Sequence, residues 1–184
     1  MRNAAILFFT LFCFSSLSNA QCRGYRNYVS ASFNGNILNK SLGMSEASNA
    51  SGFEFSYGKA IGWGYNHGLK ISSSKYQFAN NGLNAMSDFT IGYELGQKII
   101  EIGSLNLKLF ADAGMGFRKT SIQNGDFSNN KSTFFDSNLG AEVGFKPICF
   151  IELYGRTSMG YQFSKASQGA NFRPLNSVGL RYFL

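Results

Sequence analysis

The chain has 184 residues, including 21 glycines, 19 phenylalanines and 9 tyrosines but only 2 prolines, and its formal charge is +7 at pH 7. After residue 20, no apolar run approaches the about 20 residues that a membrane-spanning helix needs, which excludes a helical membrane protein. One histidine and three cysteines leave no spacing suited to zinc, so we expect no metal and no cofactor. Sequence rich in glycine and aromatic residues is typical of strands and turns.

The N-terminus has the three parts of a secretory signal peptide. Arg2 provides a basic start, positions 4–17 are largely apolar, and Ser18-Asn19-Ala20 offers small residues at the two positions that signal peptidase reads. The apolar stretch is too short to cross a bilayer as a helix, so a retained anchor is the less favoured alternative. We expect a signal peptide over residues 1–20 and one mature domain over residues 21–184. Export argues against a nucleic-acid partner.

Strict alternation of apolar and polar residues recurs along the mature chain, and this period of two predicts strands with two different faces. Within residues 104–118, every second residue from Leu105 to Phe117 is apolar. A helix would mix the two sets, because its period is about 3.6 residues. The pattern predicts eight strands, each of about the length that a tilted strand needs to cross a bilayer. They span residues 25–33 (with no clear phase), 53–58, 61–72, 88–96, 104–118, 135–145, 151–161 and 177–184.

The connections between these strands alternate in length. Residues 34–50, 73–87, 119–133 and 164–173 form long connections rich in Asn, Ser, Gly and Lys, and residues 59–62, 97–103 and 146–148 form short ones. Outer-membrane barrels have short periplasmic turns and longer outer loops. The rhythm therefore predicts that both ends of the mature barrel lie in the periplasm.

Alternation alone leaves two arrangements open, because a soluble, lipocalin-like barrel also alternates, with its apolar face inside. The large apolar side chains would overfill the narrow interior of an eight-stranded barrel. The polar face is rich in glycine, which makes room in a crowded interior, and it carries five charges of each sign. Enclosed charges need partners. We therefore predict an all-β, eight-stranded antiparallel transmembrane up-and-down β-barrel with an interior charge network: Glu54, Lys70, Glu94, Lys108, Asp112, Arg118, Glu142, Glu152, Arg156 and Arg181.

Aromatic residues lie near both ends of the predicted strands, as expected of the two aromatic belts of a transmembrane barrel. Ordinary β-propensity of aromatic residues is the alternative explanation. The belt near the short turns comprises Trp63, Tyr93, Phe145 and Tyr182, and the belt near the long loops comprises Phe33, Phe53, Phe89, Phe117, Phe135 and Tyr161.

Two cysteines remain after Cys13 leaves with the signal peptide. Cys22 precedes the first strand and Cys149 lies at a short connection, so both belong to the periplasmic rim, where disulfides form. A Cys22–Cys149 disulfide is our hypothesis, and two unpaired thiols too far apart to join are the alternative.

The last seven residues, 178–184, alternate and are rich in aromatic side chains. With the strand count and the loop rhythm, they make residues 25–184 resemble the small outer-membrane barrels of the OmpA and OmpX type. Chains of that family usually end in Phe, whereas here Phe183 precedes a final Leu184. The resemblance implies an outer-membrane location, contact with outer-membrane lipid and insertion by the barrel-assembly machinery. The positive charge of the chain favours contact with lipopolysaccharide phosphates, although solubility of the loops is the preferred explanation of that charge. We expect a monomer.

Three functions are open at this point. We favour a non-enzymatic barrel with a polar, side-chain-filled interior and surface loops for structural, binding or adhesion roles, because loops carry function on rigid scaffolds. His67 on the apolar face resembles the outward-facing histidine of lipid A deacylases, but their serine lies two residues later, where this chain has Leu69. A narrow porin is the third function, although the interior charges would plug it. We therefore expect no enzymatic activity. An extracellular ligand, another component of the cell envelope and no specific partner are all open for the loops.

Overall fold

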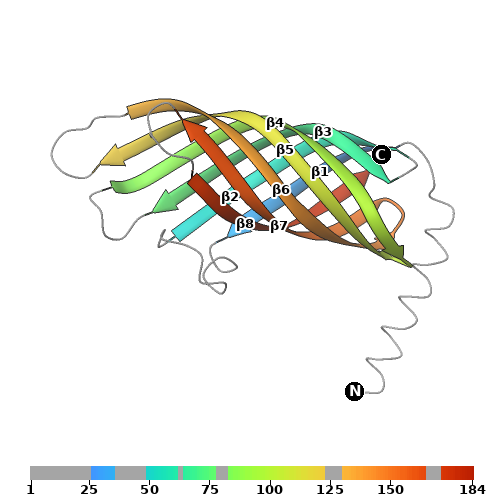
Figure 1. Cartoon of the computed structure of the whole chain (residues 1–184). Helices are drawn as coiled ribbons and strands as arrows, with labels where there is room; N and C mark the ends of the chain where they lie inside the picture. The colour runs from blue at the N-terminus through green and yellow to red at the C-terminus, as the bar shows by residue number, and fades with distance from the viewer. Residues whose placement is uncertain (1–25, 36–48, 62–63, 78–82, 123–129, 165–170) are drawn as a thin grey trace, which may run out of the picture.

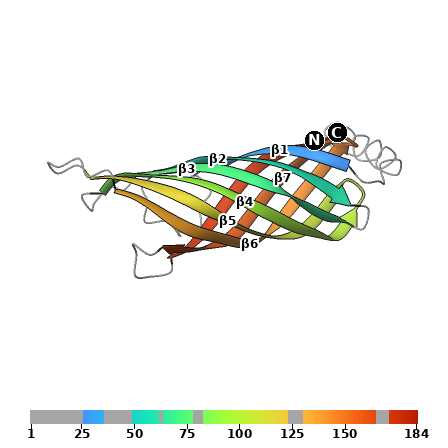
Figure 2. The ribbon, with the colours of Figure 1, turned by 90° about the horizontal axis from the view of Figure 1, so that it is seen from above.

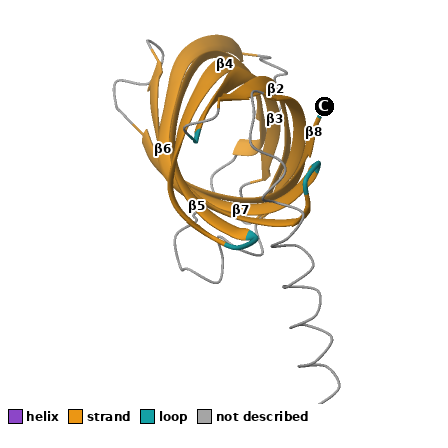
Figure 3. Ribbon diagram, turned by 90° about the vertical axis from the view of Figure 1, so that its right-hand side faces the viewer, coloured by secondary structure: helices purple, strands orange, loops and turns teal. Residues whose placement is uncertain are grey.

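A computed structural model of the chain describes residues 26–35, 49–61, 64–77, 83–122, 130–164 and 171–184. Each strand pairs antiparallel with the next in sequence, and β1 also pairs with β8, so the sheet closes into a barrel. Figure 1 shows the tilted strands from the side, and Figure 3 shows the ring from one end. The predicted eight-stranded up-and-down barrel is confirmed. The strands are β1 (Arg26–Gly35), β2 (Asn49–Ile61), β3 (Tyr65–Gln77), β4 (Leu83–Ile102), β5 (Leu105–Ile122), β6 (Asn130–Ile148), β7 (Ile151–Ser164) and β8 (Asn171–Phe183).

The two ends of the barrel differ. Short turns join β2 to β3, β4 to β5 and β6 to β7 at one end, which we call the short-turn end. The C-terminus lies there as well (Figures 1 and 2), where the Leu184 N–H donates to the Asn27 carbonyl at 2.9 Å. We call the opposite end the long-loop end; the connections there, and the first 25 residues, lie outside the described part of the chain. None of the described residues forms a helix long and apolar enough to cross a membrane.

The two faces of the barrel are inverted relative to a soluble protein. Large apolar side chains cover the exterior, for example Leu69 and Leu139, which are 59% and 67% exposed. The first strand, which had no clear phase in the sequence, turns Ser30 and Ser32 inward and Phe33 outward. Polar and charged side chains fill the interior, and the buried apolar side chains among the described residues are all aromatic. They are Tyr28, Phe110, Phe134, Tyr154 and Phe183. The predicted apolar exterior is confirmed.

Inward glycines make space for these rings. A Cβ atom on Gly116 would lie 2.1 Å from Cζ of Phe134, which stands opposite it on the neighbouring strand. A Cβ atom on Gly179 would lie 2.6 Å from Cζ of Tyr154. Distances this short are steric overlaps, so Phe134 and Tyr154 fit in the lumen because the residue facing each of them lacks a side chain.

The turn between β2 and β3 differs from the prediction. Ile61, which we expected to begin a strand, ends β2, and β3 begins only at Tyr65. Gly64, which the alternation placed on the interior face, lies in the turn with a φ of 85°, and its N–H donates to the Ile61 carbonyl at 2.9 Å. Because L-residues rarely adopt this φ, the glycine is required by the turn and not by the lumen.

The two other short connections lie later in the chain than predicted. β4 continues through residues 97–102 and β6 through residues 146–148, so the turns are Gly103–Ser104 and Cys149–Phe150. Register shifts occur between Lys98 and Ile100 and between Phe145 and Ile148. A bulge inserts an extra residue and breaks the alternation of faces. The apolar–polar alternation therefore ends before β4 and β6 do, and the predicted strands were too short.

Strands also extend into each of the four predicted long connections. β5 continues to Ile122 and β6 starts at Asn130, inside the predicted 119–133 loop, and β3 continues to Gln77, inside the predicted 73–87 loop. The ends of β1, β2, β4, β7 and β8 extend likewise. Outside the lipid-facing apolar band, backbone hydrogen bonds to the neighbouring strands are enough to hold a strand in the sheet. Its outward-facing residues can then be polar, so the sequence shows no apolar–polar alternation there.

Substitution of Leu139 by Arg tests the inverted faces, because this residue lies near the middle of β6 on the exterior. We expect Leu139→Arg to lower the free energy of unfolding of the barrel in lipid vesicles by about 2–4 kcal/mol, the cost of a cation at the bilayer midplane. Ile102→Arg is the matched control, since Ile102 is also 67% exposed but lies beside a turn, where the cost is about 0–1 kcal/mol. Urea titration measures both, and equal costs would contradict the arrangement.

Candidate functional site

The lumen holds a set of ion pairs that we call the lumen network. Alternation along each strand turns its members inward, and they come from every strand except β1. Its members are Glu54 on β2, Lys70 on β3, Glu94 on β4, Lys108 and Asp112 on β5, Glu142 on β6, Glu152 and Arg156 on β7, and Arg181 on β8.

Two carboxylates near the short-turn end share their cations. Lys108 Nζ lies 2.9 Å from Glu142 Oε1 and 2.7 Å from Glu152 Oε1. Arg181 donates through Nη1 and Nη2 to Glu142 at 2.8 and 3.0 Å, and through Nη1 to Glu152. The Asn106 amide also donates to Glu152 at 2.8 Å. Each carboxylate therefore has several charge-assisted donors, which compensates the cost of burying it.

Arg156 joins three carboxylates from different sides of the barrel. Its Nη1 and Nη2 atoms donate to the two oxygens of Glu94 at 2.6 and 2.8 Å, and Nη1 also donates to Glu54 at 3.0 Å. Its Nε atom donates to Glu142. The guanidinium lies 4.6 Å from the ring centroid of Phe110. A planar guanidinium suits this position, because it makes a bidentate pair and stacks on an aromatic ring at the same time.

Lys70 extends the network toward the middle of the lumen. Its ammonium group donates to Asp112 and lies 3.7 Å from Glu54. The Asn138 amide donates to the other oxygen of Asp112 at 2.7 Å. The Asp112 side chain is 3% exposed, so these contacts replace its hydration.

Arg118 belongs to a separate pair nearer the long-loop end. It donates from Nε and Nη2 to the two oxygens of Asp88, both at 2.8 Å, and from Nη2 to Gln162. Its guanidinium lies 4.9 Å from the Phe134 ring centroid. Asp88 was not among the charges predicted for the network, although the alternation of its strand placed it on the same polar face.

The lumen network is buried inside the barrel. The side chains of Glu94, Glu142, Glu152 and Arg181 are at most 1% exposed, and an eight-stranded barrel encloses little more than its own side chains. Within the described residues, no group of three or more His, Cys, Asp or Glu side chains could hold a metal ion. The interior is thus arranged for internal pairing of charges.

The aromatic residues predicted for the short-turn end lie on the exterior where they are described, although Tyr93 lies near the middle of β4, which continues to Ile102. Tyr93 and Tyr182 are 44% and 41% exposed, and Phe145 is half-buried. The Tyr182 ring makes an edge contact with Phe150, with centroids 5.9 Å apart. Trp63 lies outside the described residues, and the belt as a membrane-interface feature stays a prediction.

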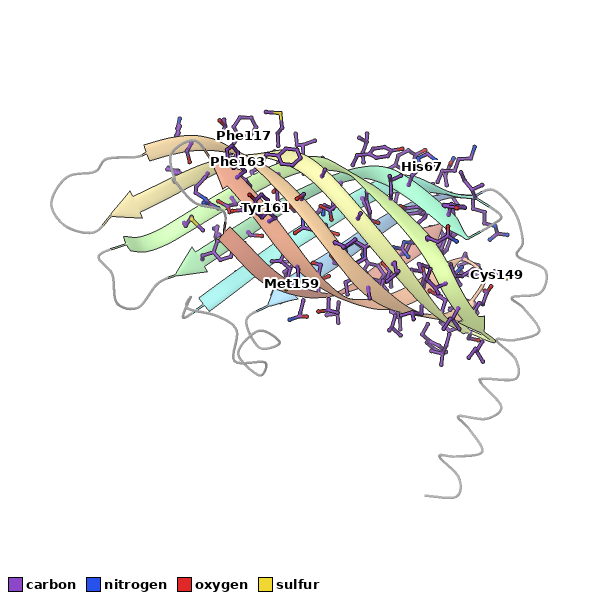
Figure 4. The ribbon with its side chains drawn as sticks, viewed as in Figure 1. His67, Phe117, Cys149, Met159, Tyr161 and Phe163 are labelled. Carbon is purple, nitrogen blue, oxygen red and sulfur yellow. The ribbon has the colours of Figure 1, made fainter. Side chains whose placement is uncertain are left out.

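His67 has a tyrosine and not a serine as its partner. Its Nδ1 atom lies 2.5 Å from the Tyr93 hydroxyl, and Figure 4 shows it on the exterior toward the short-turn end. Ser73, the next outward-facing serine along β3, is six residues away, which corresponds to about 20 Å at the rise of a strand. A base and a nucleophile need hydrogen-bond contact, so these two residues do not form a hydrolytic pair.

Cys149 lies in the turn between β6 and β7 at the short-turn end (Figure 4). It is disulfide-bonded, and the other cysteines of the chain, Cys13 and Cys22, lie outside the described residues. The pairing with Cys22 therefore stays a prediction.

Solved structures with the same fold include outer-membrane proteins. Neisserial surface protein A (NspA) aligns with a TM-score of 0.54 and 12% identity over 86% of this chain and 95% of that chain. A major outer membrane protein from Thermus thermophilus aligns with a TM-score of 0.56 and 10% identity over 87% and 99%. Ail of Yersinia pestis, in complex with the heparin analogue sucrose octasulfate, aligns with a TM-score of 0.52 and 14% identity over 87% and 97%. No protein-family model and no curated protein matches the chain. At these identities the likeness shows the fold, which is that of small outer-membrane barrels.

Glu142 is the residue whose loss tests the lumen network most directly, because it contacts Lys108, Arg156 and Arg181. We expect Glu142→Gln to lower the free energy of unfolding by about 3–5 kcal/mol, since it leaves buried cations without their counter-charge. The matched control is Glu101→Gln, which removes an exposed pair with Lys98 and costs under about 1 kcal/mol. Urea unfolding in lipid vesicles measures both, and a Glu142→Gln barrel as stable as the control would contradict a stabilising network.

The disulfide is tested on the full mature chain. If Cys22 and Cys149 are bonded, alkylation without reduction leaves the protein mass unchanged, and reduction followed by alkylation adds two alkyl groups. Cys22→Ser should then leave Cys149 open to alkylation without any reductant. Two modified cysteines in the unreduced wild-type protein would refute the pairing.

Proposed function

We propose that the chain is a non-enzymatic outer-membrane β-barrel, closed inside by paired charges, whose long-loop end serves a structural, binding or adhesion role. The observation that carries this proposal is the combination of an apolar exterior with the lumen network. An exterior of exposed Phe, Leu, Ile and Tyr side chains is stable only in contact with lipid. The signal peptide expected over residues 1–20 supplies the export that an outer-membrane location requires.

The closed interior supports a scaffold role over a channel. The guanidinium groups of Arg156 and Arg181 connect carboxylates on four different strands across the lumen. Moving either side chain to open a path would break several buried charge-assisted hydrogen bonds at once. A narrow porin is therefore the weaker alternative, and a lipid A deacylase is weaker still, because His67 faces Tyr93 instead of a serine.

A rigid barrel with long connections at one end favours recognition by those connections. The Ail structure, which has the same fold, contains a heparin analogue, and this supports an extracellular ligand for a barrel of this design. We propose that the chain acts as a monomer, that the barrel-assembly machinery inserts it, and that the short-turn end faces the periplasm.

Location and conductance together test the proposal. We expect the protein to separate with the outer membrane on a sucrose gradient, to need detergent after purification, and to show no stable conductance steps in planar bilayers. A general diffusion porin treated in the same way provides the positive control. Large, stable steps would favour the porin alternative, and a monodisperse protein without detergent would overturn the membrane location.

A further inference from the structure

Two lysines face each other on the exterior at the long-loop end. Lys119 on β5 and Lys131 on β6 are direct cross-strand partners, and both side chains are exposed. Lys75 lies in the same row, because it pairs with Ser87 on β4, which in turn pairs with Lys119. Neighbouring strands are about 4.8 Å apart, so Lys119 and Lys131 are adjacent and Lys75 lies two strands away. We call these three residues the lysine row.

None of the three lysines forms an ion pair with a carboxylate of the described part of the chain. Every described side-chain carboxylate except that of Glu101 faces the lumen, and Glu101 pairs with Lys98 at the short-turn end. Like charges directly opposite each other on one face of a sheet are destabilising. An anion bound between Lys119 and Lys131 would remove this repulsion.

From the lysine row toward the short-turn end, the exterior changes from polar to apolar. A lipid with a polar headgroup and apolar acyl chains would match this order. The next row consists of Ser73, Phe89, Phe117 and Thr133, and the row after it of Ile71, Ile91, Met115 and Phe135. A hollow of about 580 Å³ lies against Phe89, Phe117, Lys119 and Lys131, and Figure 4 shows Phe117 near the long-loop end. Asp88 also lines this hollow, but its two oxygens are held by Arg118.

We infer that this hollow binds the phosphorylated headgroup of an outer-leaflet glycolipid of the lipid A type. The ammonium groups of Lys119 and Lys131 would bind one phosphate, Lys75 would contact a second anionic group of the same headgroup, and the acyl chains would lie on Phe89, Phe117 and the apolar row. Lysine ammonium groups bind phosphate as point charges. A soluble anion would use the lysines but would leave the aromatic and apolar rows without a partner.

The inference rests on the proposed outer-membrane location, and its experiment uses the purified full mature chain in detergent. The probes are bisphosphorylated lipid A, the same lipid after removal of its phosphates, and inorganic tripolyphosphate, with binding measured by native mass spectrometry. We expect Lys119→Gln/Lys131→Gln to weaken binding of bisphosphorylated lipid A about thirtyfold, from about fivefold per lysine at an anionic lipid surface. Lys119→Arg/Lys131→Arg should restore binding to near the wild-type affinity.

The matched control, Lys59→Gln/Lys98→Gln, removes two lysines at the short-turn end and should bind like the wild type. Heat-dependent mobility in gels shows whether each variant is folded. Should the glutamine variant fail to fold, the wild-type protein still provides the test, because it must prefer phosphorylated over dephosphorylated lipid A.

Equal binding of the two lipids, or equal binding by the glutamine and control variants, would overturn the site. Tripolyphosphate binding as tight as that of lipid A would overturn the glycolipid as its ligand. Either failure would leave the membrane location intact, because fractionation tests that location separately.

Discussion

The pairing of charges across a closed lumen is the constraint on which the rest of this barrel depends. A narrow interior cannot hydrate Glu142 or Glu152, so each carboxylate must meet cations from other strands. Arg156 on β7 reaches Glu94 on β4 and Glu54 on β2, and Arg181 on β8 reaches Glu142 on β6. None of these contacts joins two strands that are neighbours in the sheet. The backbone ladder fixes the order of adjacent strands, and the lumen network adds connections through the interior between strands that the ladder does not join.

The same constraint determines where glycine and aromatic residues occur. Side chains that pair charges occupy much of the lumen, and the remaining space is filled by rings such as Phe134 and Tyr154. Because the facing residues are Gly116 and Gly179, these rings can lie against the opposite backbone. The rings in turn stack on Arg118, Arg156 and Arg181. The charged side chains, the aromatic rings and the glycines thus fill the lumen together, which leaves the large apolar side chains on the exterior.

Alternation of apolar and polar residues was sufficient to predict the strands, because a period of two is a local property of a strand. The inverted faces required further observations, namely the bulk of the apolar side chains and the glycines and balanced charges of the polar face. It could not predict strand ends where a bulge shifts the faces, as at Lys98 and Phe145, or where a strand continues into water without an apolar face, as at Lys119. Alternation also placed Arg156 and Glu94 on one face but could not pair them. That contact depends on barrel closure, which brings together residues 62 positions apart.

The distribution of charge on the two surfaces completes the argument. Carboxylates are almost confined to the lumen among the described residues, where they neutralise Lys108, Arg156 and Arg181. Lys119 and Lys131 occupy strand positions of the opposite parity and therefore point to the exterior, where no described carboxylate reaches them. The alternation of side-chain direction along β5 thus places Lys108 in the lumen and Lys119 on the exterior. The interior charges find their partners within the described part of the chain, whereas the exterior lysines are the cations for which we propose a partner in the surrounding membrane.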